Sequence, residues 1–257
     1  MLINILAIGD VCGQTGVDVL TDKLGALQRL YGASFTVVNG ENAAGLGITK
    51  DQAQAIRSAG ADVITLGNHT WNKREITSYL DDNTFILRPS NFAPQVPGRG
   101  WGIYKTPFGE LCVINLIGRE NIRFNADNPF LEADRLLEAV GAKIILVDFH
   151  AEMTSEKCAM AYYLDGRVTA VWGTHTHVQT SDAGVLPEGT GYITDLGMTG
   201  AITSVIGMKV AEPVSRFLGN PPGRLVPADG PPKIEGAVFE IDTDTGLCAS
   251  AEAIRVI

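Results

Sequence analysis

Short buried strands alternate with amphipathic helices along most of the chain, and this alternation restricts the fold more than any other feature. The runs INILAI, FTVV, DVITL, KIILVDF and VTAVW are apolar and rich in branched side chains, as is typical of strands buried on both faces. Between the first two runs, apolar residues recur at helical spacing from Val17 to Leu30, with Gly32 as the stop. The pattern predicts one α/β domain over residues 1–257, with a central sheet and helices outside it.

Capping residues predict where further helices begin. The candidate pairs are Thr49 with Gln52, Asn72 with Glu75, and Asn128 with Pro129. Proline- and glycine-rich loops separate shorter strands between Phe85 and Leu116. The segment from Ile234 to Val256 predicts a closing hairpin with its turn at residues 244–246. We therefore expect the sheet to become partly antiparallel towards its end.

Composition restricts the class of protein. No run of about 18 apolar residues exists, so we expect no membrane span. The four cysteines are far apart and the chain opens on a strand pattern instead of a leader sequence, which favours a cytoplasmic location. A net charge of −9 argues against an extensive nucleic-acid surface, which needs clustered lysine and arginine. It does not exclude a phosphoesterase, because a metal can supply positive charge locally.

Unusual polar residues follow the predicted strands. In strand order these residues are Asp10, then Glu41 and Asn42, then Asn68 and His69, then His150, and finally His175 and His177. Every histidine of the chain is in this set. Ligands of open α/β sheets bind beyond the carboxyl ends of the strands, so we expect these side chains to meet in one crevice.

The types of side chain in this set predict a metal site. Imidazole together with carboxylate and amide oxygen suits iron, manganese, zinc or cobalt, and the lack of paired cysteines argues against a structural zinc site. The set is too large for one ion, and two ions need a bridging carboxylate. Glu41 is the natural bridge. Two ions about 3.5–4 Å apart can hold a hydroxide and clamp a phosphoryl group.

A set of motifs in fixed order then resembles a known family. The stretches GDVCG, NGENAAGLGIT, GNHTW, VDFHAEMTSEK, GTHTHVQTSD and GYITDLGMTG together resemble the YmdB-like branch of the calcineurin-type metallophosphoesterases, almost from end to end. The resemblance implies a four-layer α/β-β/α sandwich with mixed sheets. It also implies two transition-metal ions per chain, with iron first and manganese or zinc as alternatives. The implied activity is a phosphodiesterase acting on 2',3'-cyclic nucleotides through a hydroxide that bridges the metals.

The resemblance also implies a role for each matching residue. The first metal would take Asp10, Glu41 and His177, and the second would take Glu41, Asn68, His150 and His175. His69 would face the phosphate as a catalytic residue without binding metal. The wider superfamily has a histidine where this chain has Cys12; we expect Cys12 to be a packed side chain and Asn42 to complete the first metal site through its amide oxygen.

The residues alone leave two other functions open. The same ions would polarise a carbonyl, so another dinuclear metal hydrolase, such as an amidohydrolase, is an alternative. A non-catalytic regulator that binds nucleotide is the second alternative, although the full ligand set and His69 argue against it. In the preferred interpretation the partner is a small phosphodiester such as a cyclic nucleotide. The sequence leaves homo-oligomerisation open.

Overall fold

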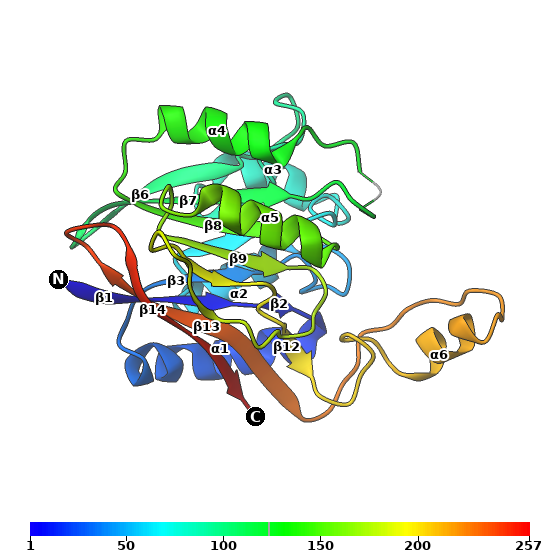
Figure 1. Cartoon of the computed structure of the whole chain (residues 1–257). Coiled ribbons are helices and arrows are strands. Elements are labelled where there is room, and N and C mark those ends of the chain that lie inside the picture. Colours follow the sequence, from blue (N-terminus) through cyan, green and yellow to red (C-terminus); the bar gives the residue numbers. More distant parts are fainter. Residues whose placement is uncertain (123) are drawn as a thin grey trace.

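The computed structural model describes residues 1–122 and 124–257, whose strands form two mixed sheets packed face to face (Figure 1). The larger sheet has the strand order β2 (Asp10–Val11), β12 (Met198–Ala201), β13 (Pro232–Asp242), β1 (Leu2–Ile8), β3 (Ala33–Asn39), β4 (Val63–Thr65), β5 (Ile86–Leu87), with β14 (Cys248–Val256) also on β13. The smaller has the order β10 (Gly184–Val185), β11 (Gly191–Ile193), β9 (Ala170–Thr174), β8 (Ile144–His150), β7 (Gly109–Ile117), β6 (Trp101–Thr106). A run of parallel strands extends from β1 through β3 and β4 to the edge strand β5 in the larger sheet, and from β7 through β8 and β9 to β11 in the middle of the smaller.

Helices cover the outer face of each sheet. Helices α1 (Gly13–Leu30), α2 (Lys50–Ser58) and α3 (Ile76–Asp82) pack on the larger sheet, and α4 (Pro129–Ala139) and α5 (Thr154–Leu164) pack on the smaller. Side chains alternate along the buried strands, so that Leu6 and Ile8 of β1 face the helices while Ile5 and Ala7 face the other sheet. The four-layer sandwich with mixed sheets is thus confirmed.

Most of the layer between the sheets is apolar. Trp172 of β9 stacks on Phe239 of β13 across this layer, with ring centroids 5.6 Å apart. Leu146 of β8 and Val37 of β3 belong to the same cluster. Strands covered on both faces must be apolar at nearly every position, and this explains the unbroken apolar runs in the sequence.

Two of the three predicted helix starts are confirmed. Thr49 and Gln52 form a capping box at the start of α2, and Asn128 accepts a hydrogen bond from the amide of Phe130 at the start of α4. The start predicted at Asn72 is wrong. Helix α3 begins only at Ile76, because Asn72 lies in a turn in which its main-chain amide donates to the carbonyl of His69 at 3.0 Å. The side-chain nitrogen of Asn72 also faces Nδ1 of His69, at 3.2 Å. Its predicted partner Glu75 instead accepts from the main-chain amide of Lys50, at 3.1 Å.

A long connection between β12 and β13, residues 202–231, extends away from the two sheets (Figure 1). We call this connection the arm. It carries the short helix α6 (Ala211–Phe217) at its outer end, where Phe217 is 87% exposed. No helix among the described residues is both long enough and apolar enough to cross a bilayer.

Candidate metal centre

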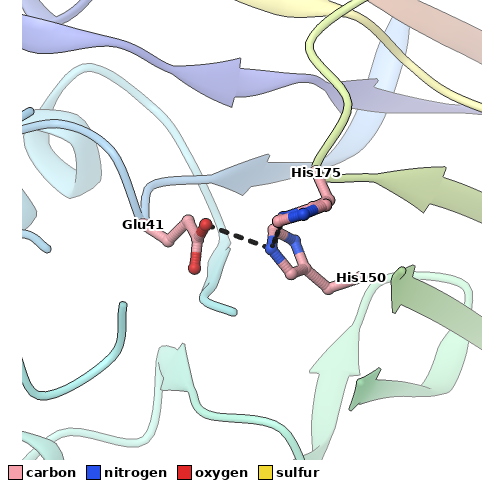
Figure 2. A group of neighbouring side chains, drawn as sticks. All are labelled: Glu41, His150 and His175. Atoms are coloured by element: carbon pink, nitrogen blue, oxygen red, sulfur yellow. Dashed lines mark hydrogen bonds and ion pairs between the residues drawn. The ribbon is translucent and has the colours of Figure 1, made fainter. Parts of the chain in front are cut away.

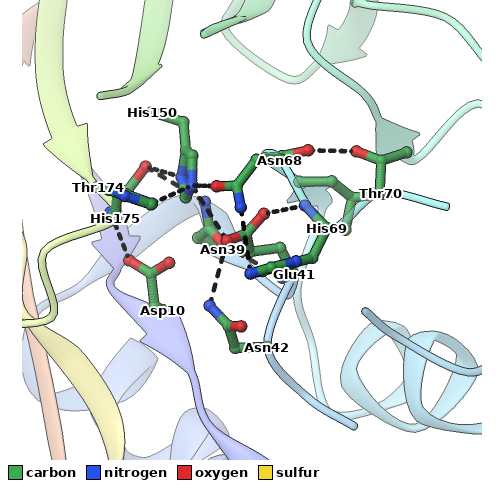
Figure 3. A network of polar contacts seen from close by, with 12 residues as sticks. Asp10, Asn39, Glu41, Asn42, Asn68, His69, Thr70, His150, Thr174 and His175 are labelled. Carbon is green, nitrogen blue, oxygen red and sulfur yellow. Dashed lines mark hydrogen bonds and ion pairs between the residues drawn. The ribbon is translucent and has the colours of Figure 1, made fainter. Parts of the chain in front are cut away.

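The predicted strand-end residues do converge on one crevice, at the carboxyl ends of the parallel strands (Figure 3). The larger sheet contributes the side chains that follow β1, β3 and β4, and the smaller sheet those that end or follow β8 and β9. Most of them are buried; Asn68, His69 and His175 are half-buried. We call Glu41, Asn68, His150 and His175 the His150 half, and Asp10, Asn42 and His177 the Asp10 half.

The His150 half is closely packed around one atom. Oε1 of Glu41, Oδ1 of Asn68 and Nδ1 of His175 each lie 3.0 Å from Nε2 of His150. Figure 2 shows the imidazoles of His150 and His175 facing Glu41. These donors end or follow four different strands, β3, β4, β8 and β9, so only the assembled sandwich brings them together.

Buried side chains of the sheets fix the orientation of His150. Its Nδ1 donates to the hydroxyl of Thr174 at 2.9 Å, and that hydroxyl donates to Oδ1 of Asp148 at 2.7 Å. Asp148 also accepts from the hydroxyl of Thr65, and burial raises the pKa of Asp148 to about 6. This hydrogen bond from Nδ1 leaves Nε2 directed into the crevice, where it can bind a metal once its own proton is lost.

His175 is supported from outside the crevice. Its Nδ1 faces His150, and its Nε2 lies 3.0 Å from Oε2 of Glu152. Burial lowers the pKa of His175 to about 3, so the ring is neutral at physiological pH. A neutral imidazole backed by a carboxylate is the usual arrangement of a metal-binding histidine.

Glu41 lies between the two halves as a carboxylate. Burial alone would raise its pKa, but His150 and the main-chain amide of His69 outweigh burial and hold the pKa at about 2. Gly67 makes room for this arrangement. A Cβ atom there would lie 2.4 Å from Oε2 of Glu41 and 2.3 Å from Nε2 of His150, so any side chain would displace both.

The Asp10 half is looser. Nε2 of His177 lies 3.6 Å from Oδ1 of Asp10, which is fully buried. Nδ2 of Asn42 lies 3.1 Å from the same histidine nitrogen and donates to Oε1 of Glu41 at 3.2 Å. The amide nitrogen of Asn42, and not the predicted oxygen, therefore faces the crevice. A half-turn of the amide brings Oδ1 to the same place.

A main-chain carbonyl and a thiol contact Nδ1 of His177, the ring nitrogen that faces away from Asp10. Its Nδ1 donates to the carbonyl of Ile206 at 2.9 Å, which turns Nε2 towards Asp10. Sγ of Cys12 lies 3.4 Å from the same Nδ1, on the side of the ring that faces away from Asp10 and Asn42. Cys12 is buried there among other side chains, in the kind of position predicted for it.

The loop that carries His175 and His177 is held in an unusual conformation. Both histidines have positive φ angles, 99° and 64°, which non-glycine residues seldom adopt. Between them, the hydroxyl and amide of Thr176 donate to Oδ2 of Asp195 at 2.7 and 3.2 Å. Asp195 forms a buried ion pair with Lys157 of α5, at 2.6 Å. The pair anchors the loop, and the loop conformation aims both imidazoles into the crevice.

His69 lines the crevice without joining either half. It shares a cavity of about 310 Å³ with Glu41, His175 and His177. Asn68 and Asn72 place their amide nitrogens 3.1 and 3.2 Å from its two ring nitrogens. Burial lowers the pKa of His69, which makes its protonated form a stronger acid. The ring is therefore exposed to a ligand in the cavity and fixed in direction.

The donor set fits a cation. Nε2 of His150 and the three atoms that lie 3.0 Å from it can all act as electron-pair donors, so a cation at this point could be bound by each of them. Donor atoms of Glu41, His150 and His175 all lie within 4.8 Å of one another, as a shared metal ion requires. In the Asp10 half, Oδ1 of Asp10 is buried and has no hydrogen-bond partner among the described residues.

Comparison with known proteins identifies the family. A model of the YmdB-like protein family matches residues 6–254. The chain belongs to the YmdB-like family. It is 44% identical to the 2',3'-cyclic-nucleotide 2'-phosphodiesterase of Bacillus subtilis, over 98% of this chain and 97% of that protein. The sequence-based assignment to this family is confirmed.

Solved structures of relatives agree with the fold. A crystal structure of a novel phosphatase from Mycoplasma pneumoniae matches with a TM-score of 0.95 and 32% identity, over 100% of this chain and 94% of the other. A hypothetical protein from Thermus thermophilus matches with a TM-score of 0.91 and 38% identity, over 99% of each chain. The name of the Bacillus subtilis relative and the phosphatase structure together confirm the prediction of an enzyme of the phosphodiesterase class.

Sequence reasoning missed the groups that support the candidate ligands. They are Asp148 and Thr174 behind His150, Glu152 behind His175, and the carbonyl of Ile206 behind His177. The first three stand within two residues of a candidate ligand, a spacing that offers a usable signal. Ile206 offers none, because a carbonyl carries no side-chain signature and 29 residues separate it from His177.

Proposed function

We propose that this chain is a dinuclear metal-dependent phosphodiesterase that hydrolyses 2',3'-cyclic nucleotides. The convergence of three potential ligand atoms on Nε2 of His150, next to a second buried carboxylate at Asp10, is the observation that carries the proposal. The Bacillus subtilis relative bears the name of this activity.

Two groups of residues would hold the ions. One ion would lie among Glu41, Asn68, His150 and His175, and the other among Asp10, Glu41, Asn42 and His177, with iron, manganese or zinc as the metal. When bound, such ions activate water for attack on phosphorus and polarise the phosphoryl oxygens. Glu41 can serve both groups because its carboxylate lies between His150 and Asn42.

His69 is proposed to act on the substrate itself. Its ring lines the cavity beside the candidate ligands, so it can donate a hydrogen bond to a phosphate oxygen or a proton to the leaving ribose oxygen. Each ring nitrogen faces an asparagine amide nitrogen, Nε2 that of Asn68 and Nδ1 that of Asn72. One of these contacts must give way to the substrate before that ring nitrogen can donate a proton. A ribose alkoxide is a poor leaving group, and protonation makes its departure easier.

Metal counting and product analysis together test the proposal. Protein purified without chelator should contain two ions per chain by elemental analysis, and should convert 2',3'-cyclic AMP to a nucleoside monophosphate, followed by chromatography. Treatment with a chelator should abolish turnover, and added iron or manganese should restore it. Cleavage of an amide but not of the cyclic nucleotide would contradict the phosphodiesterase assignment. Binding of the nucleotide without turnover by the metal-loaded protein would indicate a regulator instead.

A further inference from the structure

The cavity beside the candidate ligands has two walls of opposite character. One wall consists of the polar side chains already described. The other consists of Leu46, Ile206, Met208 and Leu225, which line the same cavity of about 310 Å³. Three of these aliphatic side chains remain substantially exposed: Leu46 at 42%, Ile206 at 51% and Leu225 at 37%. Apolar side chains around a polar catalytic site expose area that a ligand can bury.

The aliphatic wall comes mostly from the arm. Ile206 and Met208 lie on its outgoing segment and Leu225 lies on its return, whereas Leu46 belongs to the loop after β3. Main-chain hydrogen bonds hold the base of the arm together: Lys209 donates to the carbonyl of Val226 at 2.9 Å, and Ala228 to that of Gly207 at 2.8 Å. The base of the arm is thus ordered beside the crevice, while α6 lies farther out (Figure 1).

Ile206 connects this wall to the candidate ligands. Its φ angle is 45°, a conformation that is strained for a β-branched residue. Its carbonyl accepts the hydrogen bond from Nδ1 of His177 at 2.9 Å. The strained turn therefore points the carbonyl at a candidate ligand and places the side chain in the wall of the cavity. Strain of this kind persists where the surrounding structure requires one conformation.

From these observations we propose that the aliphatic wall is a subsite for the base of the substrate, so that the cavity selects nucleoside cyclic phosphates over smaller diesters. The proposal rests on the proposed function, because it takes the phosphate to lie at the polar wall. A nucleotide with its phosphate at the polar wall would find aliphatic contact for its base at the other wall of the same cavity. The volume lies at the lower end of the usual range for small-molecule sites, which suits a compact ligand.

A pair of substrates that differ only in the base tests this subsite. The first is 2',3'-cyclic AMP, and the second is the 2',3'-cyclic phosphate of 1-O-methylribose, which lacks a base. The variants are Leu225→Ala on the arm and Leu46→Ala on the loop after β3. Phe217→Ala is the matched control, because Phe217 belongs to the arm but does not line the cavity. Metal content and thermal stability are measured for all three variants.

The expected result is a loss confined to the substrate with a base. Loss of aliphatic contact should lower kcat/KM for 2',3'-cyclic AMP by about tenfold, mainly through KM, in each wall variant. The substrate without a base and the Phe217→Ala control should remain near wild type. Equal losses on both substrates, or no loss on either, would overturn the subsite and leave the proposed function intact. No turnover of either substrate by the wild-type enzyme would overturn the proposed function and the subsite with it.

Discussion

The His150 half and the Asp10 half of the candidate centre are held in place by different parts of the molecule. Buried side chains of the strands, Thr174 and Asp148, orient His150 through two short hydrogen bonds. The carbonyl of Ile206, in the arm, orients His177. The first half places three donor atoms 3.0 Å from one nitrogen, whereas the closest approach of Asp10 to His177 is 3.6 Å.

This difference indicates which half is preorganised. A site oriented by packed strands changes little when a metal binds, so less binding energy is spent on ordering its ligands. In the Asp10 half, Asn42 must turn its amide before its oxygen can bind a cation. We therefore expect the His150 half to bind its ion more tightly and the Asp10 half to lose its ion first.

The largest effect should come from the residue that both halves share. Glu41→Gln removes the negative charge between them, so we expect loss of one or both ions and of nearly all phosphodiesterase activity. Elemental analysis and a cyclic-nucleotide assay measure the two effects. Glu138→Gln, an exposed glutamate on α4, is the control for the same chemical change. Two ions and near-normal turnover in Glu41→Gln would show that Glu41 does not bridge the halves.

The next largest effect should be on the chemical step, with metal binding by both halves unchanged. His69→Ala should keep both ions and lose about 10²–10⁴-fold in turnover of 2',3'-cyclic AMP, because the leaving ribose oxygen then departs without a proton. An aryl phosphodiester should lose less, since p-nitrophenolate departs easily as an anion. Equal losses on the two substrates would reduce His69 to a phosphate-binding residue. Loss of a metal would place it among the ligands.

A smaller effect is expected from a substitution that lowers the metal affinity of one half only. Thr174→Val keeps the size of the side chain but breaks the link between His150 and Asp148. We expect the metal affinity of the His150 half to fall by about 10–100-fold, the usual cost of losing such a supporting group, and the Asp10 half to be unaffected. Calorimetric metal titration measures both sites.

Thr199→Val is the control for this titration. Thr199 is also a buried threonine, but its hydroxyl has no hydrogen-bond partner among the described residues. Its replacement should leave both metal affinities near wild type. If Thr174→Val and Thr199→Val weakened the same site equally, the hydrogen bond to Thr174 would have no specific role in holding His150.

The smallest effect should come from Cys12. Its thiol lies against Nδ1 of His177, away from Asp10 and Asn42, so Cys12→Ser should leave the metal content unchanged. The free energy of unfolding should fall by about 1 kcal/mol, as is common for small changes in packed positions. Chemical denaturation and elemental analysis check the two statements. Loss of the ion in the Asp10 half would mean that the thiol is a ligand.

Much of the fold could be predicted because the strands carry their own signal. The runs that became β1, β3, β4, β8 and β9 are apolar along their length because they are covered on both faces. The candidate site could be predicted because parallel strands bring their carboxyl ends to one edge, and each of these strands is followed there by an unusual polar residue.

The remaining features depend on contacts between distant parts of the chain. Helix α3 begins late because Asn72 contacts His69 and Glu75 contacts Lys50, so neither caps the helix as predicted. The contact of the arm with His177 had no counterpart in the sequence pattern. Orientation of a ligand by a carbonyl depends on the backbone angle of Ile206, and a local sequence signal for a strained isoleucine does not exist.

The candidate centre should hold two metal ions, one in each half, and the ion of one half should be removable without the other. The most direct test is the number of metal ions per chain in the wild-type protein and in His177→Ala, by elemental analysis after purification without chelator. We expect two ions in the wild type and one in the variant, because His177 serves only the Asp10 half and the His150 half retains its four donors. A single ion in the wild type, or loss of both ions in His177→Ala, would contradict the account.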